Sequence, residues 1–231
     1  MTLELGGKTP QIILADADLD RAHRDRAIGM FANQGQICAA GTRIVAHRSV
    51  YEQVVEGLGI AARAVRLGDP FDESATMGSL INRQQFERVM GYIDVGREEG
   101  ARVVAGGDRG LDHGFYVQPT IFADASNSMR IAQEEIFGPV GTVIAFDEVD
   151  EAVRIANDSV YGLSAAVWTR DVSIAHLLAR EVKVGAFWVN TWGVLDPALP
   201  WGGTKQSGVG REMGWAGIED CTEEKLVAIA L

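Results

Sequence analysis

The chain has few of the residues that build disulfide-bonded or metal-bound frameworks. Its 231 residues include only 2 cysteines, Cys38 and Cys221, and 4 widely separated histidines. Two cysteines cannot make a disulfide framework, and none of these residues has the spacing of a zinc site. We therefore predict no metal site and a reducing compartment, the cytoplasm.

Long apolar runs and an excess of basic residues are also missing. No apolar run approaches the ~18 residues of a membrane-spanning helix, and the N-terminus has no basic-then-apolar signal region. The net charge of −11 argues against nucleic acid or an anionic membrane surface as a main partner. We predict neither as a partner.

Apolar stretches of strand and helix length alternate along the chain. Strands are predicted at residues 10–14, 42–47, 101–105, 116–122, 142–146, 163–169 and 185–190. Helices are predicted at residues 19–31, 50–65, 82–96, 149–157 and 174–182. This alternation predicts an α/β fold with a mostly parallel, twisted sheet covered by helices. Pro119 should place its strand at an edge or a bulge.

The C-terminal third ends in two unlike segments. The glycine-rich run 201–214 cannot form regular structure for long. The apolar segment 223–231 predicts a terminal strand, and an unpaired apolar strand of this kind often pairs with another chain.

One cofactor motif occurs in the wrong context. The segment Gly57-Leu-Gly-Ile-Ala-Ala62 formally matches a dinucleotide-binding fingerprint. That fingerprint must follow a strand, whereas this segment lies within a predicted helix, so we place no cofactor there.

A single thiol lies among small residues in the stretch 33–43. Cys38 is followed by Ala39, Ala40 and Gly41, so another molecule could approach its sulfur. A cysteine becomes a good nucleophile where a helix N-terminus, a cation or a base favours the thiolate. The stretch alone favours the alternative, a buried and inert cysteine.

Four segments together resemble the aldehyde dehydrogenase superfamily. They are Leu3–Lys8, Gly35–Cys38, Glu134–Pro139 and the glycine-rich run that ends at Gly210–Gly214. The resemblance covers essentially the whole chain, as a catalytic domain (1–215) and a C-terminal oligomerisation segment (216–231). It implies that the family's N-terminal cofactor-binding domain, which should precede Leu3, is missing.

The resemblance implies roles for two reacting residues. Cys38 matches the family's nucleophile, whose thiolate adds to an aldehyde carbon. Glu4 matches the general base that activates water and that could help to deprotonate Cys38; a carboxylate serves this purpose if its pKa lies near working pH. Taken without the resemblance, Glu4 could be a solvated N-terminal charge.

Two further residues match a cofactor site for NAD or NADP. Glu135 corresponds to the carboxylate that binds the hydroxyls of the nicotinamide-side ribose, and Phe137 to the aromatic residue that lines the nicotinamide site. A helix-start carboxylate and a core phenylalanine are the alternatives. Gln85 and Arg88 lie where the family often has a cofactor-contacting Gln and Lys; because Arg88 departs from that pattern, we assign neither a role.

The remaining candidates keep two interpretations each. Trp201 matches an aromatic residue of the substrate tunnel or belongs to the core. Asn190 could line the mouth of the site or be structural, and Glu212 could relay protons or pair with Arg211. We interpret Cys221 as structural.

The function implied by the resemblance is NAD(P)-dependent oxidation of an aldehyde to a carboxylic acid through a Cys38 thiohemiacetal and thioester. We expect activity to be impaired without the cofactor domain, and a homo-oligomer formed through the C-terminal strand. Two alternatives remain: cofactor-free hydrolysis of esters or thioesters at Cys38, and an inactive dimerisation module.

Overall fold

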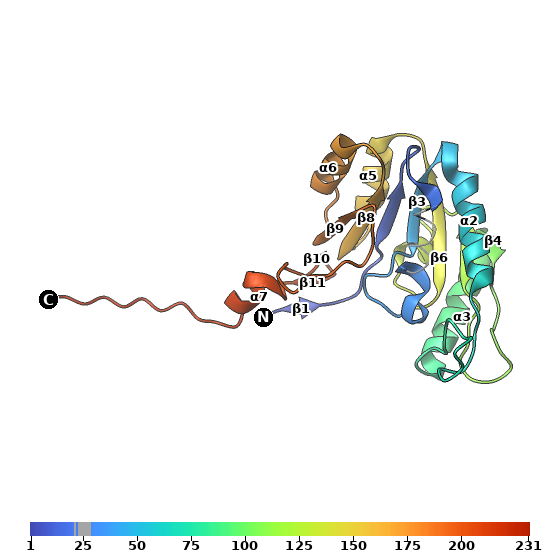
Figure 1. Cartoon of the computed structure of the whole chain (residues 1–231), viewed down its shortest axis with the longest axis horizontal. Helices are drawn as coiled ribbons and strands as arrows, with labels where there is room; N and C mark the ends of the chain where they lie inside the picture. Colours follow the sequence, from blue (N-terminus) through green and yellow to red (C-terminus); the bar gives the residue numbers. More distant parts are fainter. Residues whose placement is uncertain (21, 23–28) are drawn as a thin grey trace.

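A mostly parallel sheet forms the centre of the chain (Figure 1). The computed structural model describes residues 1–20, 22 and 29–231. Within them, seven strands pair in the order β4 (Arg102–Ala105), β5 (Thr120–Ala123), β6 (Val140–Phe146), β3 (Arg43–His47), β2 (Pro10–Ile13), β8 (Ser164–Trp168) and β9 (Ala186–Val189). All neighbours are parallel except β4 and β5. The predicted fold class is confirmed.

Helices cover both faces of this sheet because successive strand side chains point to opposite faces. Ile13 of β2 packs in a core with α2 (Tyr51–Ala64), whereas its neighbour Ile12 packs with α5 (Val149–Asn157) and α6 (Val172–Glu181). A third core lies between α3 (Arg83–Glu98), α4 (Arg130–Gln133) and strands β5 and β6. In Figure 1, α2 and the pair α5 and α6 lie on opposite sides of the strands.

Two short antiparallel pairs connect the chain ends to this body. β1 (Leu3–Glu4) pairs with β11 (Gly208–Val209), and β7 (Tyr161–Gly162) pairs with β10 (Thr204–Lys205). The glycine-rich run is therefore tied to the N-terminal segment.

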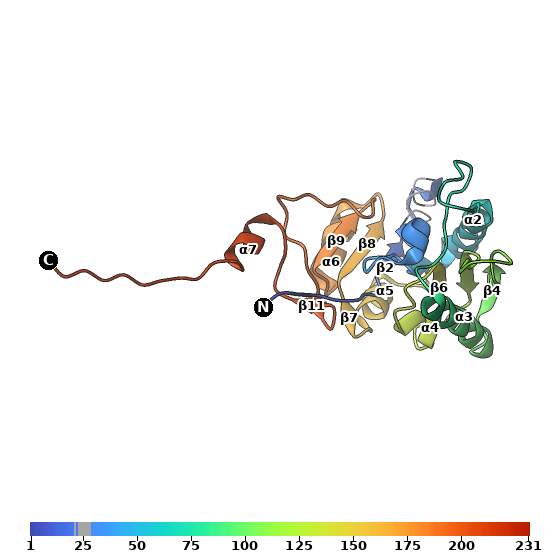
Figure 2. The same ribbon diagram turned by 90° about the horizontal axis from the view of Figure 1, so that it is seen from below.

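The segment beyond α7 (Gly214–Glu219) extends away from the body (Figures 1 and 2). Helix α7 was not expected from the sequence. The predicted strand 223–231 is exposed and pairs with no strand in the described part of this single chain. Its pairing with another chain stays a prediction, as does the division at residue 215.

Most predicted elements occur within a few residues of their expected bounds, and two differences are informative. The strand predicted at residues 116–122 begins only at Thr120, and it lies between β4 and β6, so its placement at an edge was wrong. Pro119 precedes the first strand residue and therefore removes no hydrogen bond from the ladder. Residue 21 and residues 23–28 of the predicted helix 19–31 lie outside the described residues.

A buried arginine closes the C-terminal end of α5. The Arg43 side chain, on β3, is 1% exposed. Its two terminal nitrogens donate to the carbonyl oxygens of Ile155 (3.1 Å), Ala156 (3.0 Å) and Asp158 (3.4 Å) and to the side chain of Asn127 (3.0 Å). The last carbonyls of a helix lack partners within it, and a cation there also complements the helix dipole. Arg43 thereby joins the sheet to α5.

We expect Arg43→Met to lower the free energy of unfolding by at least about 3 kcal/mol, because several buried carbonyl oxygens would lose their donor. Arg48→Met is the matched control, since Arg48 follows the same strand but pairs with Asp147 at the surface. Urea unfolding of both variants measures the difference. Equal losses would contradict the role of Arg43.

Candidate active site

The loop that carries Cys38 is shaped by three consecutive left-handed residues. Asn33, Gln34 and Gly35, in the 3-10 turn η1 (Ala32–Gly35), have φ values of 48°, 58° and 69°. A Cβ at Gly35 would also collide with the carbonyl of Gly138. Only glycine tolerates both the conformation and the contact. The Cys38 loop therefore lies directly on the loop that contains Glu135.

A second pair of glycines brings the N-terminal segment to the same place. The Gly7 N–H donates to Oε1 of Glu135 (3.1 Å), and a Cβ at Gly7 would lie 2.7 Å from the Cys38 carbonyl oxygen. A Cβ at Gly6 would collide with the Glu135 carboxylate. The segments containing Glu4, Cys38 and Glu135 thus meet in the fold.

Cys38 is half-buried in an aromatic cluster. It packs against a buried cluster that includes Leu163 and Trp188, and Trp192 and Trp201 pack against the same cluster. The Trp192 indole donates to the carbonyl of Ala39 (3.0 Å). Burial raises the pKa of the Cys38 thiol; the negative charges of Glu4 and Glu135 act in the same direction, and the Ala39 amide opposes them. The resting form at neutral pH is therefore the thiol.

The Glu4 carboxylate faces the glycine-rich run. Its Oε1 would lie 3.0 Å from a Cβ at Gly202, and this atom is buried and accepts no hydrogen bond from the described residues. Burial is the main cause that raises the pKa of Glu4; Glu212 adds to it, while the Trp201 indole opposes it. The structure has no hydrogen bond between Glu4 and Cys38 in its described part, so contact would need the Glu4 side chain to turn.

Glu135 and Phe137 lie on the loop after α4. Burial raises the pKa of Glu135, against the Gly7 amide and the positive charges of Lys8 and Arg88. Phe137 has a φ of 61° and is 38% exposed, so it is not a core residue. Its ring remains accessible at the surface of this chain.

The two residues left without a role, Gln85 and Arg88, hold this loop. Gln85 donates to the carbonyls of Ile136 (3.0 Å) and Phe137 (2.7 Å), and Arg88 donates to the Glu135 carbonyl (2.6 Å). Both extend from α3. Their position on one face of a helix was visible in the sequence, but their acceptors are backbone atoms that no local pattern reveals.

The other candidates differ in whether they lie at a pocket or have a structural role. Trp201 stacks on Trp188 with ring centres 6.0 Å apart and borders an apolar cavity of about 400 Å³, so it belongs to both the cluster and a pocket. Asn190 exchanges two hydrogen bonds with the Thr169 backbone, which favours a structural role. Arg211 donates to the carbonyls of Gly203 and Gly210. No ion pair between Arg211 and Glu212 occurs in the part of the chain that the structure covers.

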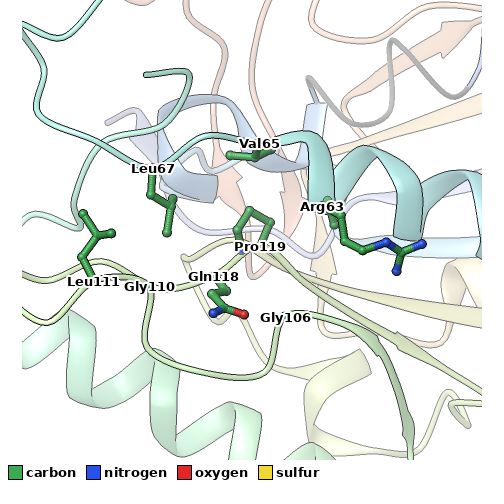
Figure 3. Close-up of a pocket in the computed structure, with 9 residues that line it drawn as sticks. Arg63, Val65, Leu67, Gly106, Gly110, Leu111, Gln118 and Pro119 are labelled. Carbon is green, nitrogen blue, oxygen red and sulfur yellow. The ribbon is translucent and has the colours of Figure 1, made fainter. Parts of the chain in front are cut away.

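A second cavity, of about 350 Å³, lies between the end of α2 and the loops around β4 and β5 (Figure 3). Arg63, Leu67 and Gln118 are among its lining residues, which include none of the candidate site residues. Within residues 1–20, 22 and 29–231, no group of three or more His, Cys, Asp or Glu side chains could hold a metal ion. No helix over the same residues is long and apolar enough to cross a membrane.

Comparison with known proteins gives one consistent family. Residues 1–227 match the model of the aldehyde dehydrogenase family. The chain is 45% identical over its full length to the protein DhaS of Bacillus subtilis and 43% identical to betaine aldehyde dehydrogenase of Brucella melitensis. The alignments cover 47% and 48% of these relatives, so the chain spans about half of their length.

The solved structures agree. The NAD+ complex of an aldehyde dehydrogenase from Bacillus cereus superimposes with a TM-score of 0.94 at 46% identity. That superposition covers 96% of this chain and 45% of the Bacillus cereus chain.

We expect Glu4→Gln to accelerate alkylation of Cys38 by up to roughly threefold at pH 8, because loss of the nearby negative charge lowers the pKa of the thiol. The rate of iodoacetamide labelling in a Cys221→Ser background reports Cys38 alone. Glu212→Gln, which removes a charge next to Glu4, serves as the control. Slower alkylation of Glu4→Gln would instead indicate that Glu4 deprotonates Cys38 in the resting chain.

Proposed function

The chain belongs to the aldehyde dehydrogenase family, and we propose that it supplies the nucleophile-bearing half of an enzyme that oxidises an aldehyde to a carboxylic acid. The observation that carries this proposal is the meeting of Cys38, the Glu4 segment and Glu135 around Gly7. A thiol, a carboxylate with a raised pKa and an accessible acceptor carboxylate are the groups that such a reaction needs.

In the first step, the Cys38 sulfur bonds to the aldehyde carbon after the thiol gives up its proton. The carbonyl oxygen takes a proton, and the product is a thiohemiacetal on Cys38. Because burial raises the pKa of this thiol, a base must assist it near neutral pH. Glu4 is a candidate for this base, because Oε1 of its carboxylate accepts no hydrogen bond within the described residues, and its side chain would have to turn towards Cys38 to serve in this step.

Glu135 and Phe137 would hold a nicotinamide cofactor, NAD or NADP. In the described part of the chain, the Glu135 carboxylate accepts a hydrogen bond from the Gly7 N–H, and this leaves acceptor capacity for ribose hydroxyls. When bound, the cofactor supplies the two-electron acceptor that converts the thiohemiacetal to a thioester. The Bacillus cereus relative in complex with NAD+ supports this choice of cofactor.

In the last step, Glu4 takes a proton from a water molecule whose oxygen bonds to the thioester carbon. The carbon–sulfur bond then breaks, the acid leaves, and Cys38 returns as a thiolate. A base works best with a pKa near the working pH, and burial moves the pKa of Glu4 in that direction.

We expect the purified chain to reduce NAD+ or NADP+ slowly with an aldehyde, and to bind either cofactor weakly, because it spans about half of its relatives. Cys38→Ala should abolish the rate, Glu135→Gln should raise the KM for the cofactor, and Cys221→Ala should change neither. Near-ultraviolet absorbance of the reduced nicotinamide measures turnover, and calorimetry measures binding. A rate that survives Cys38→Ala would disprove the proposal.

A second candidate function needs no cofactor. Cys38 and Glu4 both belong to this chain, and ester or thioester hydrolysis requires only an acyl acceptor and an activated water. The half-buried position of Cys38 in an aromatic cluster would suit an apolar acyl group.

For this activity we expect a burst of one phenol per chain from an activated phenyl ester, followed by slower turnover. Cys38→Ser should remove the burst, and Glu4→Gln should keep the burst but slow the later phase, since deacylation needs the base. Stopped-flow absorbance resolves the two phases. Absence of any burst in the unmodified chain would exclude this function.

A further inference from the structure

A buried lysine follows the glycine that contacts the candidate cofactor carboxylate, and its amine has no hydrogen-bond partner among the described residues. Lys8 follows Gly7, the residue whose N–H holds Glu135. The Lys8 side chain is 3% exposed, and its Nζ is buried without a hydrogen-bond partner in the described residues. A buried polar group without a partner is costly, so its persistence calls for an explanation.

Strand register places Lys8 beside Arg43. Pro10 of β2 pairs with Arg43 of β3, and the ladder continues one residue earlier because the Arg43 N–H donates to the Thr9 carbonyl (3.4 Å). Since strand side chains alternate between faces, Lys8 and Arg43 share a face as diagonal neighbours. Arg43 donates to carbonyls, and its Nε also lacks a partner in the described residues. It therefore offers Lys8 a positive charge and no acceptor.

The nearby carboxylates differ in what already binds them. Glu134 accepts hydrogen bonds from Arg130 and Tyr92, which hold its pKa at about 2. Glu135 forms no ion pair with Lys, Arg or His within 4 Å among the described residues, and its carboxylate accepts the Gly7 N–H. Of these two carboxylates, Glu135 is thus the one whose charge no Lys, Arg or His side chain pairs within 4 Å among the described residues.

The electrostatics of Lys8 reflect this arrangement. The pKa of Lys8 is lowered to about 7, mainly by burial; the charges of Arg43 and Arg88 act in the same direction, while Glu135 and Glu134 oppose them. In return, Lys8 lowers the pKa of Glu135. The two groups are coupled, and the coupling lies in the pH range where an enzyme works.

We propose that Lys8 is a positioning residue that acts on Glu135 through its charge: its buried, protonated amine, which makes no ion pair with Glu135 among the described residues, keeps the Glu135 carboxylate ionised so that it can accept hydrogen bonds from a hydroxylated ligand. This inference rests on the proposed role of Glu135 in binding ribose. Lys8 and Glu135 attract each other only while both are charged, which is above the pKa of Glu135 and below about pH 7. The attraction is lost as the pH rises through about 7, because Lys8 becomes neutral.

The chain contains only four lysines, Lys8, Lys183, Lys205 and Lys225, so each can be titrated separately by NMR of ε-13C-lysine. We expect one resonance, absent from Lys8→Met, to titrate near pH 7. Glu135→Gln should move its midpoint down by about one unit, whereas Glu134→Gln should move it less. By reciprocity, Lys8→Met should raise the midpoint of the Glu135 carboxyl by the same amount as Glu135→Gln lowers that of Lys8.

The stability of the Lys8→Met variant provides a second measurement. We expect Lys8→Met to unfold no more easily than the unmodified chain at pH 7, because an apolar chain of similar length replaces an unpartnered buried amine. The unmodified chain should gain stability relative to Lys8→Met as the pH rises from about 7 towards 10. Over this range its unfolded form holds a proton on Lys8 that its folded form has lost, so unfolding takes up a proton and becomes less favourable as the pH rises.

A Lys8 midpoint unaffected by Glu135→Gln, or moved equally by Glu134→Gln, would overturn the proposal. So would a Lys8 resonance that titrates at about pH 10.4, the ordinary value for a lysine. The titration needs neither cofactor nor turnover. It can therefore fail while the Cys38-dependent rate persists, and it can succeed if that rate is absent.

Discussion

Close backbone approach at Gly6 and Gly7 is the constraint on which the site depends. A side chain at either position would collide with the Glu135 carboxylate or lie 2.7 Å from the Cys38 carbonyl. Because both positions lack a Cβ, the segment after β1 passes between two loops that are far apart in sequence. The Gly7 contact with Glu135 lies one residue before Lys8 and three residues before β2, so one short segment joins the site to the sheet.

Burial without a full set of hydrogen bonds is the common electrostatic feature of the ionisable side chains around Gly6 and Gly7. Burial is the largest cause of the raised pKa values of Cys38, Glu4 and Glu135 and of the lowered pKa of Lys8. Each group therefore holds its neutral form more strongly than it would in water. Within the described residues, the buried side-chain atoms without a hydrogen-bond partner belong to Glu4, Lys8 and Arg43. Glu4 precedes the Gly6–Gly7 segment and Lys8 follows it, while Arg43 pairs with Pro10 at the start of β2.

The glycines of the recognisable motifs have separate structural causes. Gly35 tolerates a left-handed turn and a contact with Gly138, and this contact joins the motif of the thiol to the motif of Glu135. Gly208 pairs with Glu4 across β1 and β11, and this pairing joins the glycine-rich run to the segment that contains Glu4. The motifs of the family pattern are distant in the sequence but are neighbours in the folded chain.

Local pattern in the sequence determined the alternation of strands and helices and the parallel sheet, and the resemblance of four segments to a known family identified Cys38, Glu4 and Glu135 as candidates. Periodicity carries the first two because apolar spacing follows the geometry of each element. Tertiary structure alone decided the position of β5 inside the sheet, the direction of Glu4 towards the glycine-rich run, the closure of α5 by Arg43 and the burial of Lys8. Each of these features depends on contacts between residues that are distant in the sequence and on exclusion of water. Such contacts and such exclusion produce no periodic pattern in the sequence.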